Sequence, residues 1–400
     1  HLRLLPAEAG PSHMSRLPVA ICGVMASDEA FLGGSFVMVA DMLVILRDVQ
    51  DPRDFTARHD LGEMLFLALC GLLCGEKTCV DIADFASAHE AEFREVLSLR
   101  HGTPSHDTLS QTLRLLDPQA LERALRACLC AMGHRLRAGG VLSVDGKALR
   151  RAYEAGQSHM PPVMVSVFDG LTRLSLAQSR AGAGGEAEAA RALLGSLVVK
   201  GCTVTADALH CRPDTATVIR KGGADYVLGL KTNQPKLYAA AEAAFARAKA
   251  VPSHTVQDEG HGRVVRRMAH VMAAPADAKT LLPGLSAFGR IVSVRQVAGG
   301  REEVHTRYFV LSRRLTPGRF AMLVRAHWGI ENHLHWTLDV IFHEDDARSR
   351  KNYAPENLAL LRRLARNIME AHPSDLPIRK KMKHASWSKD YLFNVFTHVR

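Results

Sequence analysis

Three carboxylates in the sequence stand where they could bind metal ions. Asp145 ends the apolar run VLSVD, and Asp207 ends a second such run, TVTAD. We expect both runs to be central strands, and open α/β sheets bind ligands at the carboxyl ends of such strands. Two Asp on neighbouring strands would repel each other unless a cation lay between them. Either Asp alone could instead be a turn residue or a helix cap.

The third carboxylate, Glu331, lies in the segment RAHWGIENHLHWTLD. Read as a helix, His327, Glu331 and His335 share one face, because they are spaced by four residues. The large apolar side chains around them would pack that helix down and hold the carboxylate in place. Two alternatives remain. One is a zinc site, although it lacks the His-Glu-x-x-His pattern of the common metalloproteases. The other is a plain amphipathic helix with polar residues on one side.

Together, two strand-end Asp and a helix Glu predict a two-metal site for phosphoryl transfer. One ion would activate water or a 3′-hydroxyl, and the other would stabilise the leaving oxygen in an in-line displacement. Oxygen ligands favour the hard ions Mg²⁺ or Mn²⁺ over zinc. Phosphate oxygens of DNA and water would complete the coordination of each ion.

Basic and polar residues near these carboxylates are candidate contacts to the DNA backbone. Lys147 follows the first Asp by two residues and could reach a phosphate, or it could be a solvated surface lysine. Lys231 and Asn233 follow the predicted strand DYVLGL, where a backbone contact and a polar loop are equal alternatives.

Glu186 and Glu188 receive no catalytic role, whereas Asp345 and Asp346, together with Glu344, leave an alternative open. Glu186 and Glu188 begin a predicted helix after two glycines, where acidic side chains favour the helix dipole. Asp345 and Asp346 could supply a fourth metal ligand, but a solvated helix end is the better interpretation.

The composition fits a basic globular protein. Of 400 residues, 47% are hydrophobic and 23% charged, which excludes wholesale disorder, collagen-like repeats and a coiled-coil rod. The net charge of +10 is compatible with a nucleic-acid partner, although solubility alone can explain it.

The eight cysteines lack zinc-knuckle spacing and predict buried thiols of a cytosolic protein. The apolar run from Met64 to Gly75 is too short to span a bilayer, so we expect no membrane association.

Hydrophobic periodicity divides the chain into four parts. Residues 1–40 are irregular and Gly-rich, and we expect a leader that need not be translated. Residues 41–138 have helical spacing and predict an all-helical domain for DNA recognition or assembly. Residues 139–371 alternate strands and helices, which predicts an α/β domain: a mixed sheet with helices on both faces. A β-rich insertion at about 250–315, with a hairpin turn at Gly299-Gly300, interrupts it, and residues 372–400 form a basic tail.

Several segments resemble the motifs of bacterial insertion-sequence transposases of the DDE type, in the branch that includes the H-repeat-associated proteins. They are VDGKALRR, TADALH, GADYVLGLKTNQPKLY, HGRVVRR and HWGIENHLHWTLDVIFHEDDARSR. The upstream DPRDFTARHDLGEMLFLALCGLLCGEKTCVDIADFA, with GTPSHDTL, resembles the helical domain that precedes the catalytic domain in that branch. The resemblance implies an RNase H-like fold with a β-rich insertion, a catalytic triad of Asp145, Asp207 and Glu331, and Mg²⁺ (or Mn²⁺) as cofactor.

The same resemblance implies a function. The protein would cleave the terminal inverted repeats of its own mobile element and join them to target DNA. It would act as a homodimer on DNA in the bacterial cytoplasm, associated with the nucleoid while bound. Two alternatives stay open: a catalytically inactive or repurposed DNA-binding protein that retains the transposase fold, and a metal-dependent hydrolase of another substrate.

One feature of the wider group is missing. Many of its members carry a Tyr, Arg, Glu, Lys signature around the third acid, and here Val324, His327 and Leu338 occupy the places other than Glu331. Other side chains are candidates to handle the DNA strand instead. They are Arg325, His327, His333, His335, Arg348 and Arg350.

Overall fold

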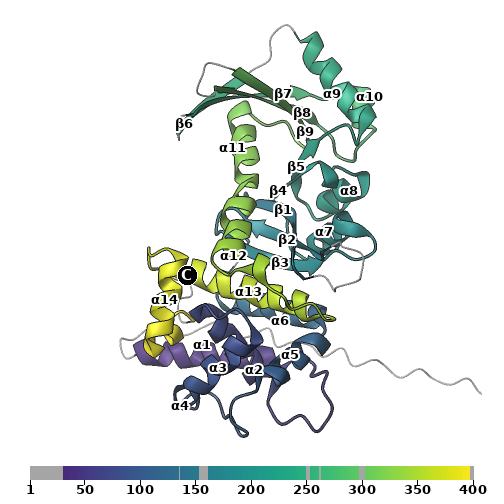
Figure 1. Ribbon diagram of the computed structural model, residues 1–400. Coiled ribbons are helices and arrows are strands. Elements are labelled where there is room, and N and C mark those ends of the chain that lie inside the picture. Colours follow the sequence, from purple (N-terminus) through teal and green to yellow (C-terminus); the bar gives the residue numbers. More distant parts are fainter. Residues whose placement is uncertain are drawn as a thin grey trace, which may run out of the picture.

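The computed structural model describes residues 30–134, 136–152, 161–248, 253–260, 263–296 and 302–396. Residues 1–29 of the predicted leader, the predicted Gly299-Gly300 turn and residues 397–400 of the tail lie outside these ranges. The described chain forms a helical region, a sheet with its helices, and an outer extension of that sheet (Figure 1). No helix within these ranges is long and apolar enough to cross a membrane.

The N-terminal region is helical, as predicted. Its helices are α1 (Ala30–Arg47), α2 (Leu61–Cys74), α3 (Cys79–Ala88), α4 (Glu90–Phe93), α5 (His106–Leu115) and α6 (Pro118–Ala131). Helix α1 spans the boundary that we placed at residue 40. Every residue of α2 is buried, which makes it the centre of this region. A capping box between Thr78 and Asp81 begins α3, and the Ser105 side chain caps α5.

Five strands form the inner part of the sheet, in the order β3-β2-β1-β4-β5. They are β1 (Val141–Ala148), β2 (Val163–Asp169), β3 (Leu174–Arg180), β4 (Thr203–Ala206) and β5 (Asp225–Leu230). Strand β1 pairs antiparallel with β2 and parallel with β4, and β4 pairs parallel with β5. This mixed arrangement is the expected RNase H-like one, and the predicted α/β fold class is confirmed.

Helices cover both faces of these strands. Helices α7 (Gly185–Gly195) and α8 (Pro213–Lys221) pack on one face, and α11 (Pro317–His327) and α13 (Ala354–Ala371) on the other. The short α12 (Trp336–Val340) packs against α13. The alternation of side chains along β1 separates the two faces. Val144 points into the apolar core that contains Leu193 of α7, whereas the Ser143 hydroxyl lies 3.5 Å from the carbonyl oxygen of Ala326 in α11.

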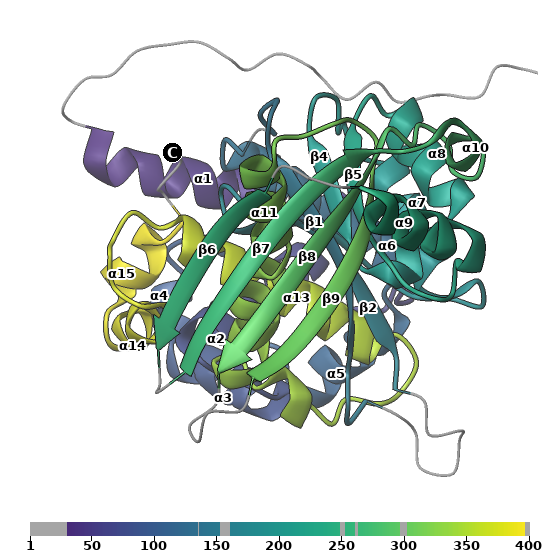
Figure 2. The same ribbon diagram turned by 90° about the horizontal axis from the view of Figure 1, so that it is seen from above.

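The β-rich insertion continues the same sheet. Its strands are β6 (Ser253–Gly260), β7 (Arg263–Ala273), β8 (Ala287–Gln296) and β9 (Glu302–Leu311). They are antiparallel and lie side by side (Figure 2), and β9 also pairs antiparallel with β5. The sheet therefore has nine described strands. Helix α9 (Pro235–Arg247) leads into the insertion, and the short α10 (Ala276–Lys279) follows β7.

Helix α13 joins the helical region to the sheet, as Figure 1 shows. Three of its arginines are fully buried. Arg362 donates to the carbonyl oxygen of Lys77 at 3.0 Å, Arg363 lies 3.4 Å from Glu122 of α6, and Arg366 donates to the carbonyl oxygen of Arg173 just before β3. Because a buried charge is costly unless it is paired, these contacts fix the position of α13 between the two regions.

The predicted tail forms two helices, α14 (Ile378–Trp387) and α15 (Lys389–Asn394), that pack against α2. Not all of its basic residues face solvent. Lys381 is buried and its ammonium donates to the carbonyl oxygens of Met369 and His372, each at 2.9 Å. The C-terminal helices therefore complete the core of the helical region.

Candidate active site

The parallel pairing of β1 and β4 brings two of the predicted carboxylates together. Val144 of β1 lies opposite Ala206 of β4, so that Asp145 and Asp207 are the next residues along the two neighbouring strands. The strand-end positions expected from the sequence are thus adjacent in the structure. Strand β1 runs on to Ala148, whereas β4 ends just before its carboxylate.

Glu331 comes from a helical run that crosses β1. Between α11 and α12 the run contains a π-helical segment, Ile330–His335, and this segment packs against β1. Buried Ile330 and Leu334 anchor it to the core, while Glu331 is exposed. Short π-helical segments widen a helix locally and are frequent at functional sites.

Other carboxylates lie close enough to Asp145 to affect its ionisation. Burial, as the largest cause, and the negative charges of Glu186, Asp207 and Glu331 together raise the pKa of Asp145 to about 7, against a backbone hydrogen bond from Gly146 that lowers it. Residues far apart in the sequence therefore bring their charges to one place. Ionised carboxylates so arranged repel each other, and a cation between them would relieve the repulsion.

Asp207 also caps a short turn. Its Oδ1 accepts a hydrogen bond from the Leu209 amide at 2.9 Å, at the start of a 3₁₀ turn, Ala208–His210. The Asn233 side chain holds the same turn, because its amide donates to the carbonyl oxygen of Ala208 at 2.8 Å. Gly229 of β5 permits the close approach, since a Cβ there would lie 3.0 Å from the Ala208 nitrogen.

Glu186 is a functional candidate that sequence reasoning assigned only to a helix N-terminus. The structure places its carboxylate against Gly146 of β1 and 3.2 Å from Nε2 of buried His210. Nothing in the sequence near Glu186 distinguishes it from other acids that begin helices. The one signal was the glycine next to Asp145, which leaves room for a neighbouring side chain.

Two histidines that we expected beside Glu331 are half-buried and neutral. Burial lowers the pKa of His327 to about 4, and its Nδ1 lies 3.2 Å from the Thr205 hydroxyl of β4. Burial likewise lowers the pKa of His335 to about 4, and its Nδ1 lies 3.6 Å from Oδ2 of Asp145. Neither ring carries the positive charge that a contact to phosphate would use. Both pack the helical run onto the sheet.

The donor set suits a hard divalent cation. Asp145, Asp207, Glu331 and Glu186 offer only carboxylate oxygens, which Mg²⁺ and Mn²⁺ prefer. Within the described ranges, no three His, Cys, Asp or Glu side chains are gathered as closely as metal ligands. The zinc alternative finds no support, because His327 and His335 face different partners on the sheet.

Lys147 occupies a different place from the predicted DNA contact. It is only 8% exposed, and its ammonium lies 2.7 Å from Asp339, 3.0 Å from Glu344 and 3.0 Å from Asp345. Although burial alone would lower it, these carboxylates raise the pKa of Lys147. An ammonium has three donors, and three carboxylates surround this one. Lys147 therefore ties β1 to the segment after α12, and its ammonium donates a hydrogen bond to Asp345 at 3.0 Å.

Arg325 lies beside a basic cavity that adjoins the Glu331 segment. Its side chain is 68% exposed and lies 3.1 Å from Asp258 of β6. The cavity, of about 650 Å³, lies between the insertion strands and α11, and Gly329 and Asn332 also line it. Arg267 and Arg307 lie over the ring of Trp328 in its wall, 5.6 and 5.5 Å from the ring centre.

Arg348 and Arg350 line a second basic cavity, of about 680 Å³, between the helical region and the segment after α12. Lys77 and Arg114 of the helical region line it too, together with Lys351 from the segment before α13. Arg350 donates to the carbonyl oxygen of Arg151 at 2.9 Å. The other predicted contacts, Lys231 and Asn233, are exposed at the end of β5.

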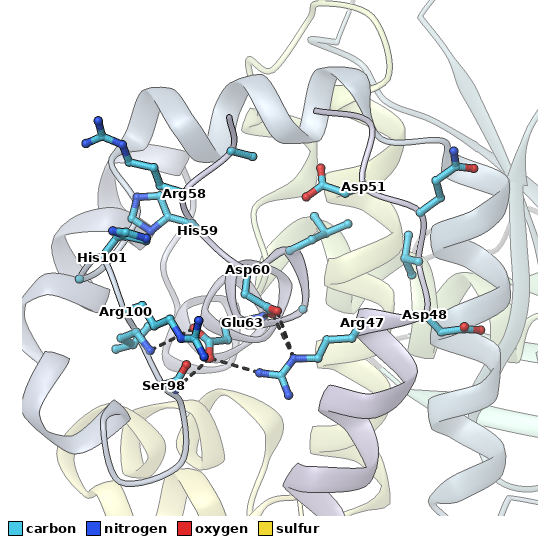
Figure 3. A pocket seen from close by; sticks show the side chains of 17 residues that line it. Arg47, Asp48, Asp51, Arg58, His59, Asp60, Glu63, Ser98, Arg100 and His101 are labelled. Carbon is cyan, nitrogen blue, oxygen red and sulfur yellow. Dashed lines mark hydrogen bonds and ion pairs between the residues drawn. The ribbon is translucent and has the colours of Figure 1, made fainter. Parts of the chain in front are cut away.

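A third cavity, of about 820 Å³, lies in the helical region and has mixed charge (Figure 3). Two of its acidic side chains, Asp60 and Glu63, have partners. Glu63 accepts hydrogen bonds from the amides of Ser98 and Leu99, and Arg47 lies 3.2 Å from both Asp60 and Glu63. This network joins α1, α2 and the loop before α5, and we assign it a structural role.

At the positions where the wider group carries its signature Tyr and Lys, this chain has the apolar residues Val324 and Leu338. Leu338 is fully buried in the core shared with the helical region, and Val324 packs against the apolar core of the insertion. Packing therefore accounts for these side chains.

Comparison with known proteins identifies the family of both regions. Residues 136–368 match the family described as "Transposase DDE domain", and residues 43–128 match "DDE_Tnp_1-associated". The chain is 30% identical over 353 residues to "H repeat-associated putative transposase YhhI" of Escherichia coli strain K12, covering 84% of this chain and 92% of that protein. It is 29% identical over 350 residues to "Putative transposase YncI" of Escherichia coli O157:H7, covering 84% and 88%.

A solved structure, "Cryo-EM structure of piggyBac transposase synaptic complex with hairpin DNA (SNHP)", aligns over 91% of this chain and 78% of its own. The TM-score is 0.42 and the sequence identity 12%, which is too distant to support an argument.

Proposed function

The chain belongs to the transposase DDE family, and from this membership we propose that it cuts and joins the DNA ends of its own mobile element by metal-dependent phosphoryl transfer. The observation that carries the proposal is the electrostatic convergence on Asp145. Asp207 and Glu331, which are 62 and 186 residues further along the chain, both raise the pKa of its carboxyl group.

Asp145, Asp207 and Glu331 would hold Mg²⁺ or Mn²⁺, which supplies nucleophile activation and charge neutralisation for an in-line displacement at phosphorus. The chain's other residues position these carboxylates. His335 packs beside Asp145, while Asn233 and the Leu209 amide hold the turn that bears Asp207. Lys147 keeps β1 in place without taking part in the reaction.

DNA would follow the two basic cavities. One adjoins the Glu331 segment and contains Arg307 and Arg325, and the other contains Arg114 and Arg348. Arginine is suited to such a surface because its planar group binds phosphate through paired hydrogen bonds. Lys231, at the end of β5, is exposed and would add a further backbone contact. His327, His335 and Lys147 are left out of this surface for the reasons given above.

Because two DNA ends must be joined in one reaction, we propose a homodimer on the terminal inverted repeats, acting in the cytoplasm. The alternative is a DNA-binding protein that keeps the fold without turnover. Asp207 in its capping position is compatible with that alternative, since in this conformation its Oδ1 is engaged by the Leu209 amide.

A cleavage assay on DNA that carries the matching element ends separates the two. Wild-type protein with Mg²⁺ should nick the ends, and Asp145→Asn should bind the same DNA without nicking it. Asp214→Asn, an exposed Asp in the first turn of α8, is the matched control and should cleave normally. Wild-type protein that shifts the DNA in a gel but never nicks it would support the non-enzymatic alternative.

A further inference from the structure

Glu186 reaches the catalytic strands from the far side of the sheet. It lies in the first turn of α7, the helix packed on the face opposite α11. Its carboxyl carbon lies 2.4 Å from the point that a Cβ at position 146 would occupy. Gly146 follows Asp145 directly, so the absence of a side chain there allows a fourth carboxylate to approach β1.

His210 holds Glu186 in this position. The ring is fully buried, and its Nε2 lies 3.2 Å from Oε1 of Glu186 and 4.0 Å from Oδ1 of Asp207. An ionised carboxylate can only accept a hydrogen bond, so Nε2 must be the donor. His210 thereby links α7 to the turn that bears Asp207.

Two contacts from different elements fix Glu186 beside the catalytic carboxylates. One is its approach to Gly146 of β1, the residue after Asp145. The other is its contact with His210, whose Nε2 also lies 4.0 Å from Oδ1 of Asp207. An isolated acid at a helix N-terminus would have no such relation to the strands.

We propose that Glu186, positioned by His210, is a fourth acidic residue of the catalytic site and strengthens cation binding at Asp145 and Asp207. The inference rests on the proposed function, because it presumes that these two carboxylates hold a divalent cation. It assigns to Glu186 a role beyond the DDE triad.

The test measures Mn²⁺ binding to the full chain by isothermal titration calorimetry, without DNA. Glu186→Gln keeps the size of the side chain and an acceptor for His210, and should weaken Mn²⁺ binding by about tenfold or more. Glu188→Gln makes the same charge change on the exposed side of the same helix and should stay within about twofold of the wild type. Equal Mn²⁺ affinity of Glu186→Gln and the wild type would overturn the proposal.

Two further measurements distinguish a role at the site from a merely structural one. Gly146→Ala retains every carboxylate but displaces that of Glu186, and should also weaken Mn²⁺ binding. In EDTA, Glu186→Gln should unfold at a higher temperature than the wild type because repulsion with Asp145 is lost. A lower unfolding temperature together with unchanged Mn²⁺ affinity would assign Glu186 to structure alone.

The outcome also separates this inference from the proposed function. A wild type that binds Mn²⁺ and cleaves element ends, with Glu186→Gln unchanged in both, would overturn only the role of Glu186. A wild type that neither binds Mn²⁺ nor cleaves would overturn both.

Discussion

Nδ1 of His335 lies 3.6 Å from Oδ2 of Asp145, yet the two side chains form no ion pair at neutral pH. Burial lowers the pKa of His335 to about 4, so the ring is neutral. Asp145 therefore gains no compensating charge from this neighbour, and burial together with nearby carboxylates raises its pKa to about 7. His335 therefore packs beside the Asp145 carboxylate but does not offset its negative charge, which a bound cation would do.

This raised pKa predicts that Asp145 destabilises the metal-free protein at neutral pH. The folded state binds more protons than the unfolded state between about pH 4 and pH 7, so this contribution to stability is lost as the pH rises through that window. In EDTA at pH 7.5, we expect the free energy of unfolding of Asp145→Asn to be higher than that of the wild type by on the order of 2–4 kcal/mol. At pH 4 the two should be equal.

Urea unfolding of both proteins at the two pH values measures this difference. His327 and His335, whose pKa values burial lowers to about 4, titrate in part of the same window with the opposite sign. Both proteins contain them, so their contributions largely cancel in the comparison. A difference that does not depend on pH would contradict the prediction.

Lys147 should matter for stability and not for DNA affinity. Removing its charge leaves Asp339, Glu344 and Asp345 facing one another without a cation. We expect Lys147→Gln to lower the free energy of unfolding by about 3–5 kcal/mol, as for other broken buried ion pairs. Lys231→Gln, at an exposed lysine, should change it by less than about 0.5 kcal/mol. If Lys147→Gln were as stable as the wild type but bound DNA more weakly, the hypothesis that Lys147 contacts the DNA backbone would be supported instead.

Arg114 and Arg348 should contribute to DNA binding from two different domains. Each lines the cavity between the helical region and the catalytic part. If each neutralises one phosphate, the double variant Arg114→Ala/Arg348→Ala should reduce the slope of log affinity against log salt by about 1.8. Fluorescence anisotropy with labelled DNA at several salt concentrations gives this slope. Lys279→Ala, an exposed charge on α10, is the control, and an unchanged slope in the double variant would exclude the cavity.

The helical and catalytic regions should unfold together. They share a core through α13, and Glu122 of α6 lies 3.4 Å from fully buried Arg363. We predict a single calorimetric transition for the wild type. Glu122→Ala leaves Arg363 without a carboxylate and should lower the free energy of unfolding by about 3–5 kcal/mol. Two separate transitions in the wild type would show that the regions fold independently.

The position of Asp207 could be predicted because its signal is local, since a buried strand that ends before Asp implies where the side chain lies. The predicted strand end at Asp145 is wrong, because β1 runs on to Ala148. The parallel pairing of β1 and β4 still places the two residues side by side. Glu331 was found by resemblance and by its apolar surroundings. Its setting in a π-helical segment could not be foreseen, because regular helical spacing does not reveal a local widening.

The partners of buried charges could not be predicted. Lys147 and Asp345 are 198 residues apart in the sequence, and only the folded chain shows that they pair. The sequence around Glu186 looks like the start of any helix, and its partner His210 lies in a different element. The C-terminal segment was likewise described by its charge, whereas buried Lys381 and Leu392 show that it packs.

The strand order has a mechanical consequence. Strand β5 pairs on one side with β4, which precedes Asp207, and on the other with β9 of the insertion. Hydrogen bonds therefore run without interruption from the outer strands to the carboxylates. If DNA binds to the insertion as proposed, tilting that part would strain the strands next to Asp145 and Asp207, and DNA binding would then be coupled to the alignment of these carboxylates.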